Sequence, residues 1–255
     1  MYKRQNLATV DLALKIGLQP IIETATRFGF STPFKPYPSL ALGAFEVIPL
    51  ELARAYCAFA AGGMIPFPLG LKAVVNENGH VLERKHLKIE RMISPSKAFM
   101  ITSLLRGVVE TGTGRTLGNR GIRWPVAAKT GTTNNFRDAW FIGYTPDIQA
   151  LVWVGFDNGD SIKATGAQAA LPIWAELMKT IPHQISQNDF RVPDGIVTRM
   201  ICNENGKPVV SQNCAKPRKE FFLAENAPPE SRPQGSIQGV FEKLIKGIKD
   251  IFNGD

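Results

Sequence analysis

Three apolar runs joined by short turns constrain the fold of this chain more than any other feature. The runs are rich in β-branched and aromatic residues, as strands are; they read VAAKTGT (126–132), RDAWFIGY (137–144) and IQALVWVGF (148–156). Because connections this short join antiparallel neighbours, the runs predict an antiparallel sheet. The apolar segment AQAALPIWAELMKTI (167–181) predicts a helix packed on that sheet. The expected fold class is therefore α+β, an antiparallel sheet flanked by helices.

Further helical patterns precede the sheet. The segment SPSKAFMITSLLRGVVE (94–110) has Ser94 as its N-cap and Pro95 at the first helical position. LKAVV (71–75) and HVLER (80–84) flank a polar turn and predict a hairpin. The other expected helices are NLATVDLALKIG (6–17), PIIETATRFG (20–29) and PLELARAYCAFAAGG (49–63).

Composition and charge exclude several classes of protein. The chain has 255 residues, of which 44% are hydrophobic, enough for a folded core. No stretch reaches the roughly 18 apolar residues that a membrane-spanning helix needs. The net charge of +8 is not gathered in a basic patch interleaved with aromatic residues, so no nucleic-acid partner is expected. The three histidines lack metal-ligand spacing, and neither a metal site nor a cofactor is expected.

Changes of character along the chain predict five segments. The opening MYKRQ does not belong to the helical pattern after it and is expected to be a non-native start. The amphipathic end of the chain is expected either to bind a membrane surface or a partner, or to fold back onto the domain or fray. Its apolar stripe consists of Val240, Leu244, Ile248, Ile251 and Phe252. The expected segments are the start (1–5), the α+β domain (6–182), a C-terminal extension (183–224), a proline-rich linker (225–238) and the terminal helix (239–255).

The tetrad Lys129-Thr130-Gly131-Thr132, followed by Thr133, offers chemistry on the first predicted strand. A strand edge can pair with an extended peptide, a lysine supplies positive charge, and threonine hydroxyls can hold a carboxylate. Gly131 lets a substrate approach the backbone closely. A K-T-G tripeptide alone is a weak signal, and an exposed strand end explains it equally well.

The context of the tetrad is far more specific. GRTLG, AAKTGTTNNFRDAWFIGYTPDIQALVWVGFDNG and GAQAALPIWAELM follow one another in order, after LALGAFEVIPLELARAYCAFAAGG and SPSKAFMITSLLRGVVETGTGR. Together they resemble the C-terminal part of the transpeptidase domain of class A (bifunctional) penicillin-binding proteins, over about residues 6–181. The resemblance implies the penicillin-binding and serine beta-lactamase-like transpeptidase fold, here truncated at the N-terminus. The missing first strands would leave an unpaired sheet edge, so poor solubility is expected.

The resemblance also implies site residues, because the family uses the motifs S-x-x-K, S-x-N and K-T-G in that order. Lys129 would act in catalysis, and Thr130, Gly131, Thr132 and Thr133 would bind the substrate. The Thr132 amide would help to form the oxyanion hole. Asn6 matches the asparagine of S-x-N, although Arg4 stands where the serine belongs. The loop of Thr111, Gly112, Thr113 and Gly114 would line the cleft.

The nucleophile motif is expected upstream of this chain, although three serines imitate the motifs. Ser94-Pro95-Ser96-Lys97 fits S-x-x-K literally, but it follows the S-x-N position, and Ser94 is better used as an N-cap. Ser186-Gln187-Asn188 and Ser211-Gln212-Asn213 imitate S-x-N, yet both follow K-T-G, which is the wrong order.

The implied function is cross-linking of peptidoglycan by serine acyl transfer. The expected partners are stem peptides ending in D-Ala-D-Ala, and beta-lactams that mimic them. The parent would also hold a glycosyltransferase domain and an N-terminal membrane anchor, placing the chain on the periplasmic face of the cytoplasmic membrane. An oxidising location there would favour a bridge between Cys202 and Cys214. This chain alone is expected to be inactive.

Two alternatives remain open from the sequence. One is a non-catalytic module that binds wall peptides or scaffolds the synthesis complex. The other is a relative of the beta-lactamases or D,D-carboxypeptidases, in which water rather than an amine takes the acyl group.

Overall fold

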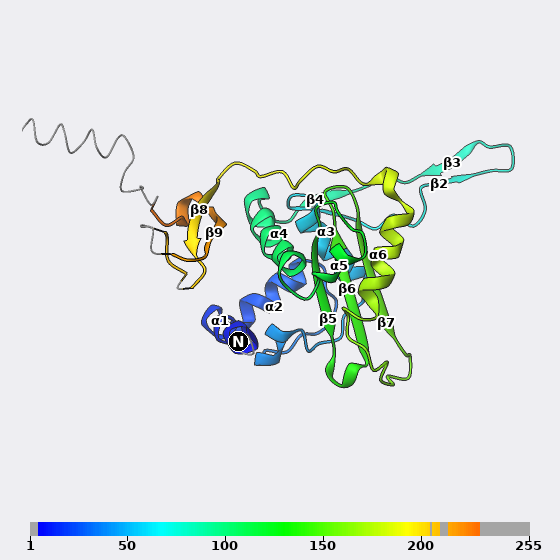
Figure 1. The fold of residues 1–255 in the computed structure, drawn as a ribbon. Helices are drawn as coiled ribbons and strands as arrows, with labels where there is room; N and C mark the ends of the chain where they lie inside the picture. Colours follow the sequence, from blue (N-terminus) through cyan, green and yellow to red (C-terminus); the bar gives the residue numbers. More distant parts are fainter. Residues whose placement is uncertain (1–4, 205, 210–213, 230–255) are drawn as a thin grey trace, which may run out of the picture. The chain divides into compact units, whose positions relative to one another are not determined.

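The fold consists of two units in a computed structural model that describes residues 5–204, 206–209 and 214–229 (Figure 1). The first unit is Met1–Val192 and the second is Pro193–Asp255. The expected non-native start falls almost entirely outside the described residues. So do the terminal helix and most of the linker.

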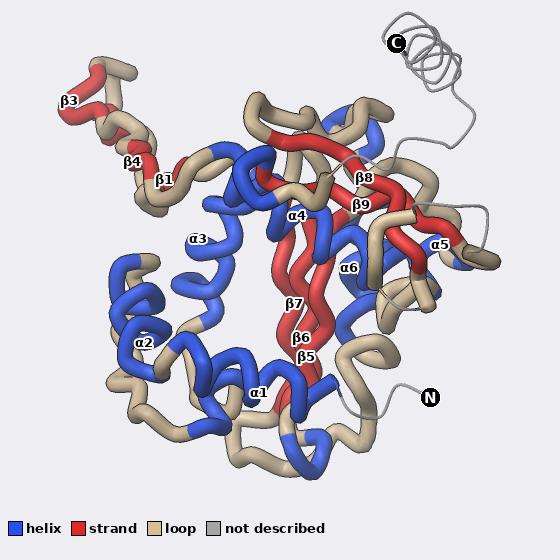
Figure 2. Tube along the Cα trace, turned by 90° about the vertical axis from the view of Figure 1, so that its left-hand side faces the viewer, coloured by secondary structure: helices blue, strands red, loops and turns tan. Residues whose placement is uncertain are grey.

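The centre of the first unit is a three-stranded antiparallel sheet, in the order β5-β6-β7 (Figure 2). Its strands are β5 (Ala127–Thr132), β6 (Asp138–Tyr144) and β7 (Gln149–Gly155). Lys129 lies opposite Ile142, and Ile142 lies opposite Leu151. The sheet predicted from the sequence is thereby confirmed, with β5 as one edge.

The helix α6 (Ala170–Thr180) covers one face of this sheet. Trp174 is fully buried there, with its ring 5.3 Å from that of Phe141, and its indole nitrogen donates to the Ala150 carbonyl oxygen. The apolar run 167–181 therefore forms the expected helix, because its apolar side chains fill the space above β6 and β7.

The helices α3 (Pro49–Ala60) and α4 (Pro95–Glu110) cover the opposite face. Side chains alternate along a strand, so Tyr144 points away from the face that holds Phe141. Its hydroxyl lies 2.9 Å from the buried Thr102 hydroxyl of α4. The Gln149 amide donates to the Ala53 carbonyl oxygen of α3. The sheet is thus held between two helical layers.

The remaining elements of the first unit surround this core. The hairpin expected at 71–84 forms from β2 and β3, and its strand residues are exposed. The bounds are α1 (Gln5–Ile16), α2 (Leu18–Arg27), η1 (Pro38–Leu42), β1 (Met64–Pro66), β2 (Ala73–Val75), β3 (Val81–Arg84), β4 (Ile89–Arg91), α5 (Thr116–Asn119), η2 (Asn134–Phe136) and η3 (Pro182–Gln184); β1 pairs with β4.

Residues 183–192 belong to the first unit, whereas the sequence predicts a domain boundary at residue 182. Ile185 lies in the main hydrophobic cluster, and the Phe190 ring packs edge-on against that of Tyr144. The Asp147 carboxylate also accepts hydrogen bonds from the amide and hydroxyl of Ser186. These contacts tie the segment to the sheet.

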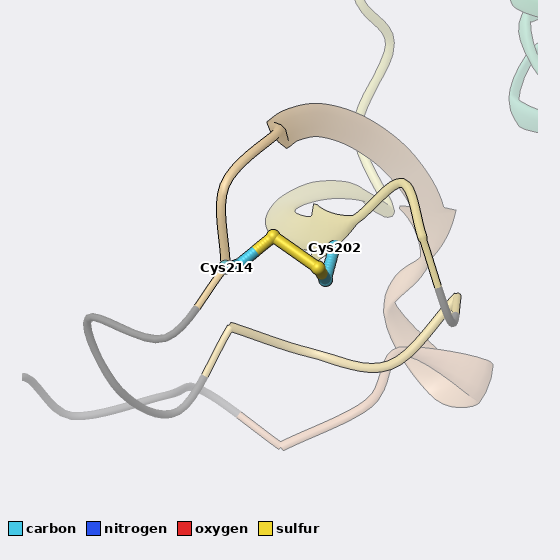
Figure 3. The surroundings of a disulfide bond; sticks show 2 residues. All are labelled: Cys202 and Cys214. Atoms are coloured by element: carbon cyan, nitrogen blue, oxygen red, sulfur yellow. A yellow bond between two sulfur atoms is a disulfide. The ribbon is translucent and has the colours of Figure 1, made fainter.

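The second unit is built on an antiparallel hairpin of β8 (Ile196–Cys202) and β9 (Pro217–Leu223), followed by η4 (Ala224–Asn226). Cys202 and Cys214 form a disulfide, with their Cα atoms 5.7 Å apart (Figure 3). Across the described ranges of both units, no helix combines the length and apolarity that crossing a membrane requires.

Candidate active site

Lys129 lies in the middle of β5, at the edge of the sheet. Its side chain shares a face with Ile142, the face on which α3 and α4 pack. The residue is exposed, yet the protein packed around its ammonium group lowers the pKa by desolvation. The ammonium donates a 2.5 Å hydrogen bond to the Thr130 carbonyl oxygen. A cation therefore stands at the open edge of the sheet.

The Thr130 hydroxyl meets the loop that follows α4. Thr130 is only 8% exposed, and its Oγ1 lies 2.7 Å from Oγ1 of Thr113. Gly112 and Gly114 allow this approach, because a Cβ atom at either position would crowd the Val108 carbonyl oxygen in the last turns of α4. The structure thus brings two sequence-predicted groups together, the cleft loop and the K-T-G strand.

The Thr132 hydroxyl lies on the same face as that of Thr130 and is exposed. Its Oγ1 accepts a 3.0 Å hydrogen bond from the backbone amide of Gly166. Gly166 touches the sheet here, since a Cβ atom would collide with the carbonyl oxygens of Gly131 and Trp140. The sequence analysis missed Gly166, because a glycine in a loop gives no sign of the strand that it will contact.

Gly131 is required for packing as well as for access to the strand. A Cβ atom at this position would lie 3.1 Å from Cβ of Trp140 on the neighbouring strand. The Trp140 ring in turn lies 6.1 Å from that of Trp153. The glycine of K-T-G therefore makes room for an aromatic pair on the Lys129 face.

Thr133 differs from the other threonines of the motif. Its hydroxyl donates to the Asp138 carboxylate at 2.9 Å and accepts from the Asp138 amide at 2.8 Å. Asp138 also accepts from the Trp153 indole nitrogen at 2.9 Å. This network closes the turn between β5 and β6, in which Asn135 and Phe136 have positive φ. The Thr133 hydrogen is therefore used within the protein.

Asn6 lies in the first turn of α1, where it is exposed. The helix α1 packs on η1 and α2. Among the described residues, no hydrogen bond joins Asn6 to Lys129. The structure thus brings Lys129, Thr130, Thr132 and the cleft loop together, but Asn6 is not bonded to them.

Ser94, the one literal S-x-x-K serine, is placed at the wrong end of α4. Its hydroxyl accepts a hydrogen bond from the Lys97 amide, so it caps the helix as expected. The Thr113 loop follows the other end of this 16-residue helix. At 1.5 Å per residue, the two ends lie about 24 Å apart, beyond the reach of any side chain. Ser94 is therefore not placed to attack a peptide held on β5.

The order of elements and the K-T-G edge strand define a penicillin-binding transpeptidase domain, and the comparison with known families agrees. Residues 1–179 match the family described as penicillin binding protein transpeptidase domain, and the chain belongs to that family. Penicillin-binding protein 1A of Aquifex aeolicus is 38% identical over 207 residues, which cover 80% of this chain and 28% of that protein. The resemblance to class A penicillin-binding proteins is thereby confirmed.

Solved structures confirm the fold. Penicillin-binding protein 1A from Haemophilus influenzae gives a TM-score of 0.80 at 27% identity, over 89% of this chain and 39% of that one. PonA1 from Mycobacterium tuberculosis, solved in complex with penicillin V, gives 0.59 at 26% identity, over 71% and 55%. The chain spans only 28% to 39% of the two penicillin-binding proteins 1A that it matches.

Proposed function

We propose that this chain supplies the K-T-G half of the active site of a D,D-transpeptidase that cross-links peptidoglycan stem peptides. The donor peptide, ending in D-Ala-D-Ala, pairs with the open edge of β5. The Thr130 and Thr132 hydroxyls bind its terminal carboxylate, and the Thr132 amide stabilises the oxyanion of the acyl-transfer step. Lys129 supplies positive charge beside both.

The observation that supports this proposal most strongly is the grouping at the edge of the sheet. Within one four-residue stretch of β5, Lys129 lies on one face of the strand and the Thr130 and Thr132 hydroxyls lie on the other, and among the described residues β5 is an edge of the sheet. Such a set suits an extended peptide with a free carboxyl terminus, because backbone pairing orients the peptide while the charge and hydroxyls select its end. Membership of the transpeptidase family supports the same assignment.

The serine nucleophile and its lysine base are proposed to come from sequence outside this chain. Among the described residues, no serine hydroxyl is bonded to Lys129, and Ser94 lies at the far end of α4. The parent protein is proposed to include a glycosyltransferase domain and a membrane anchor, and to work on the periplasmic side of the cytoplasmic membrane. Beta-lactams, as mimics of the donor peptide, are proposed to occupy the same edge; the related PonA1 has been solved in complex with penicillin V.

The test is cross-linking by the parent protein with its natural upstream sequence. Cross-linked stem peptides formed from lipid-linked precursor would be measured by mass spectrometry. Lys129→Ala is expected to lower the rate by about a hundredfold, as loss of a group that stabilises transition-state charge does. Lys72→Ala, beside the exposed β2–β3 hairpin, removes the same charge and is expected to keep the wild-type rate.

The other possible outcomes would contradict this proposal, each in its own way. Cross-linking that survives Lys129→Ala would remove the K-T-G strand from the proposed site. Release of D-Ala without cross-links would indicate a carboxypeptidase, and turnover of penicillin would indicate a beta-lactamase. Peptide binding with no product at all would indicate a wall-peptide-binding module.

A further inference from the structure

The two hydroxyls proposed to bind the carboxylate each have a second hydrogen-bonding partner within the protein. Thr130 Oγ1 lies 2.7 Å from Oγ1 of Thr113, a residue of the loop after α4. Thr132 Oγ1 lies 3.0 Å from the amide nitrogen of Gly166. A threonine hydroxyl has one hydrogen and two lone pairs, so each of these contacts restricts where that hydrogen can point.

The Gly166 contact has only one direction. A backbone amide is a donor, so Thr132 Oγ1 must accept, and its own hydrogen is left to donate elsewhere. Gly166 is held against the sheet, where a Cβ atom would collide with the carbonyl oxygens of Gly131 and Trp140. The backbone therefore restricts the directions in which the Thr132 hydroxyl can donate.

The Thr113 contact can run in either direction until a ligand is bound. Thr113 is exposed, so water can satisfy its lone pairs, whereas Thr130 is shielded from water. When a carboxylate lies at the strand, Thr130 gains most by donating to it, since a hydrogen bond to a charged acceptor is the stronger one. Thr113 then donates to Thr130, and the three groups form one chain of hydrogen bonds that strengthen each other.

We propose that Thr113 is a positioning residue that directs the Thr130 hydroxyl hydrogen toward the substrate carboxylate, as Gly166 does for Thr132. The inference rests on the proposed function and explains how the K-T-G strand would select a peptide with a free carboxyl end. With one lone pair of each hydroxyl occupied, by Thr113 or by Gly166, both hydroxyl hydrogens are directed toward the ligand. A carboxylate can accept from both, whereas an amide can accept only through its carbonyl oxygen, and its NH2 group then faces a hydroxyl hydrogen.

Removing the Thr113 hydroxyl has a specific consequence. In Thr113→Val the Thr130 hydroxyl can rotate and accept from an amide, so the strand loses part of its preference for a carboxylate. The expected loss of preference is about three- to tenfold, the range of one hydrogen bond. Thr113→Ser keeps the hydroxyl and is expected to restore the preference.

The experiment is a pair of NMR titrations of the 255-residue chain. One peptide ends in D-Ala-D-Ala with a free carboxyl group, and the other has the same sequence with a C-terminal amide. The backbone amides of Thr130, Gly131 and Thr132 report binding, and the ratio of the two dissociation constants is compared between variants. Thr180→Val is the matched control, because that hydroxyl donates to the Leu177 carbonyl oxygen within its own helix, α6.

Each outcome tests either the positioning role of Thr113 or the proposed binding of a carboxylate by the K-T-G strand. A wild-type preference for the carboxylate that falls in Thr113→Val, but not in Thr113→Ser or Thr180→Val, supports the inference. Equal weakening of both peptides in Thr113→Val would mean a merely structural role and would overturn it. An unchanged preference would also overturn it, while leaving the proposed function intact. A wild-type chain that binds neither peptide, or both equally, would overturn the proposed binding of a free carboxyl end by the K-T-G strand, and with it this inference, while cross-linking by the parent protein tests the proposed function separately.

Discussion

At the residue scale, Lys129 is exposed, yet its surroundings disfavour the charged form of its ammonium group. Its ammonium lies at the open edge of β5, where surrounding protein disfavours the charged form and lowers its pKa from the ordinary 10.5. Among the described residues, its ammonium donates a hydrogen bond to the neighbouring Thr130 carbonyl oxygen. A lysine held in this way is better suited to a ligand anion than to the stability of the fold.

This environment predicts how stability changes with pH. Between the lowered pKa and 10.5, the unfolded chain keeps a proton that the folded chain has lost, so the free energy of unfolding rises with pH. Lys129→Met is expected to abolish this rise and to be at least as stable as the wild type at pH 7. Urea unfolding between pH 7 and pH 9.5 measures both effects.

Two points complete the design of this measurement. The scan stops below pH 10, because burial raises the pKa of Tyr56 to about 12 and stability must fall as unfolded tyrosine ionises. Lys72→Met, beside the exposed hairpin, controls for the loss of one charge. A pH dependence that is the same in Lys129→Met and the wild type would contradict this account of Lys129.

At the element scale, α6 anchors the sheet through one side chain. Trp174 is fully buried, contacts the Phe141 ring and donates to the Ala150 carbonyl oxygen. Trp174→Ala is expected to lower the free energy of unfolding by about 3–5 kcal/mol, since it leaves a cavity and an unpaired carbonyl. Trp153→Ala removes a tryptophan that is 38% exposed, and less than half that loss is expected. Equal losses in urea unfolding would contradict this packing.

The stability of the hairpin of β8 and β9 is expected to depend on its disulfide. The bridge joins residues 12 apart in sequence, for which the chain-entropy argument gives about 3 kcal/mol. Reduction is expected to speed amide hydrogen exchange in Ile196–Cys202, while the amides of β6 stay protected and serve as the internal control. Unchanged exchange in β8 would show that the hairpin is stable without the bridge.

The elements that the sequence predicted correctly are those with long local patterns. The runs 126–132, 137–144 and 148–156 were recognisable because each strand is followed at once by its partner. The hairpin of β8 and β9 was not predicted, because β8 is partly polar and many residues separate it from its partner strand. The strands β1 and β4 have three residues each, too few to show a period.

In the site, as in the fold, continuous motifs could be predicted from the sequence, whereas contacts between distant residues could not. The K-T-G tetrad and the loop of residues 111–114 were found because they are continuous motifs. The bonds between Thr113 and Thr130 and between Gly166 and Thr132 join residues 17 and 34 positions apart. No spacing rule links residues that only the packing of α4 and of the loop before α6 brings together.

At the scale of the whole molecule, the chain is proposed to contain one half of a two-part site. The K-T-G strand and its cleft loop are assembled, while Asn6 is not bonded to them and the one S-x-x-K serine caps the distant end of α4. Large apolar side chains are also exposed on α1, at Leu7, Leu12, Leu14 and Ile16. The poor solubility expected from the sequence remains a prediction.

The most direct test of this account is labelling of the 255-residue chain with a fluorescent penicillin, followed by intact mass. We expect no covalent adduct, because among the described residues no serine hydroxyl is bonded to Lys129, and Ser94 lies at the far end of α4. A stoichiometric adduct would contradict the account. It would mean that this chain contains its own nucleophile, and loss of the adduct in Ser94→Ala would identify the serine dismissed here.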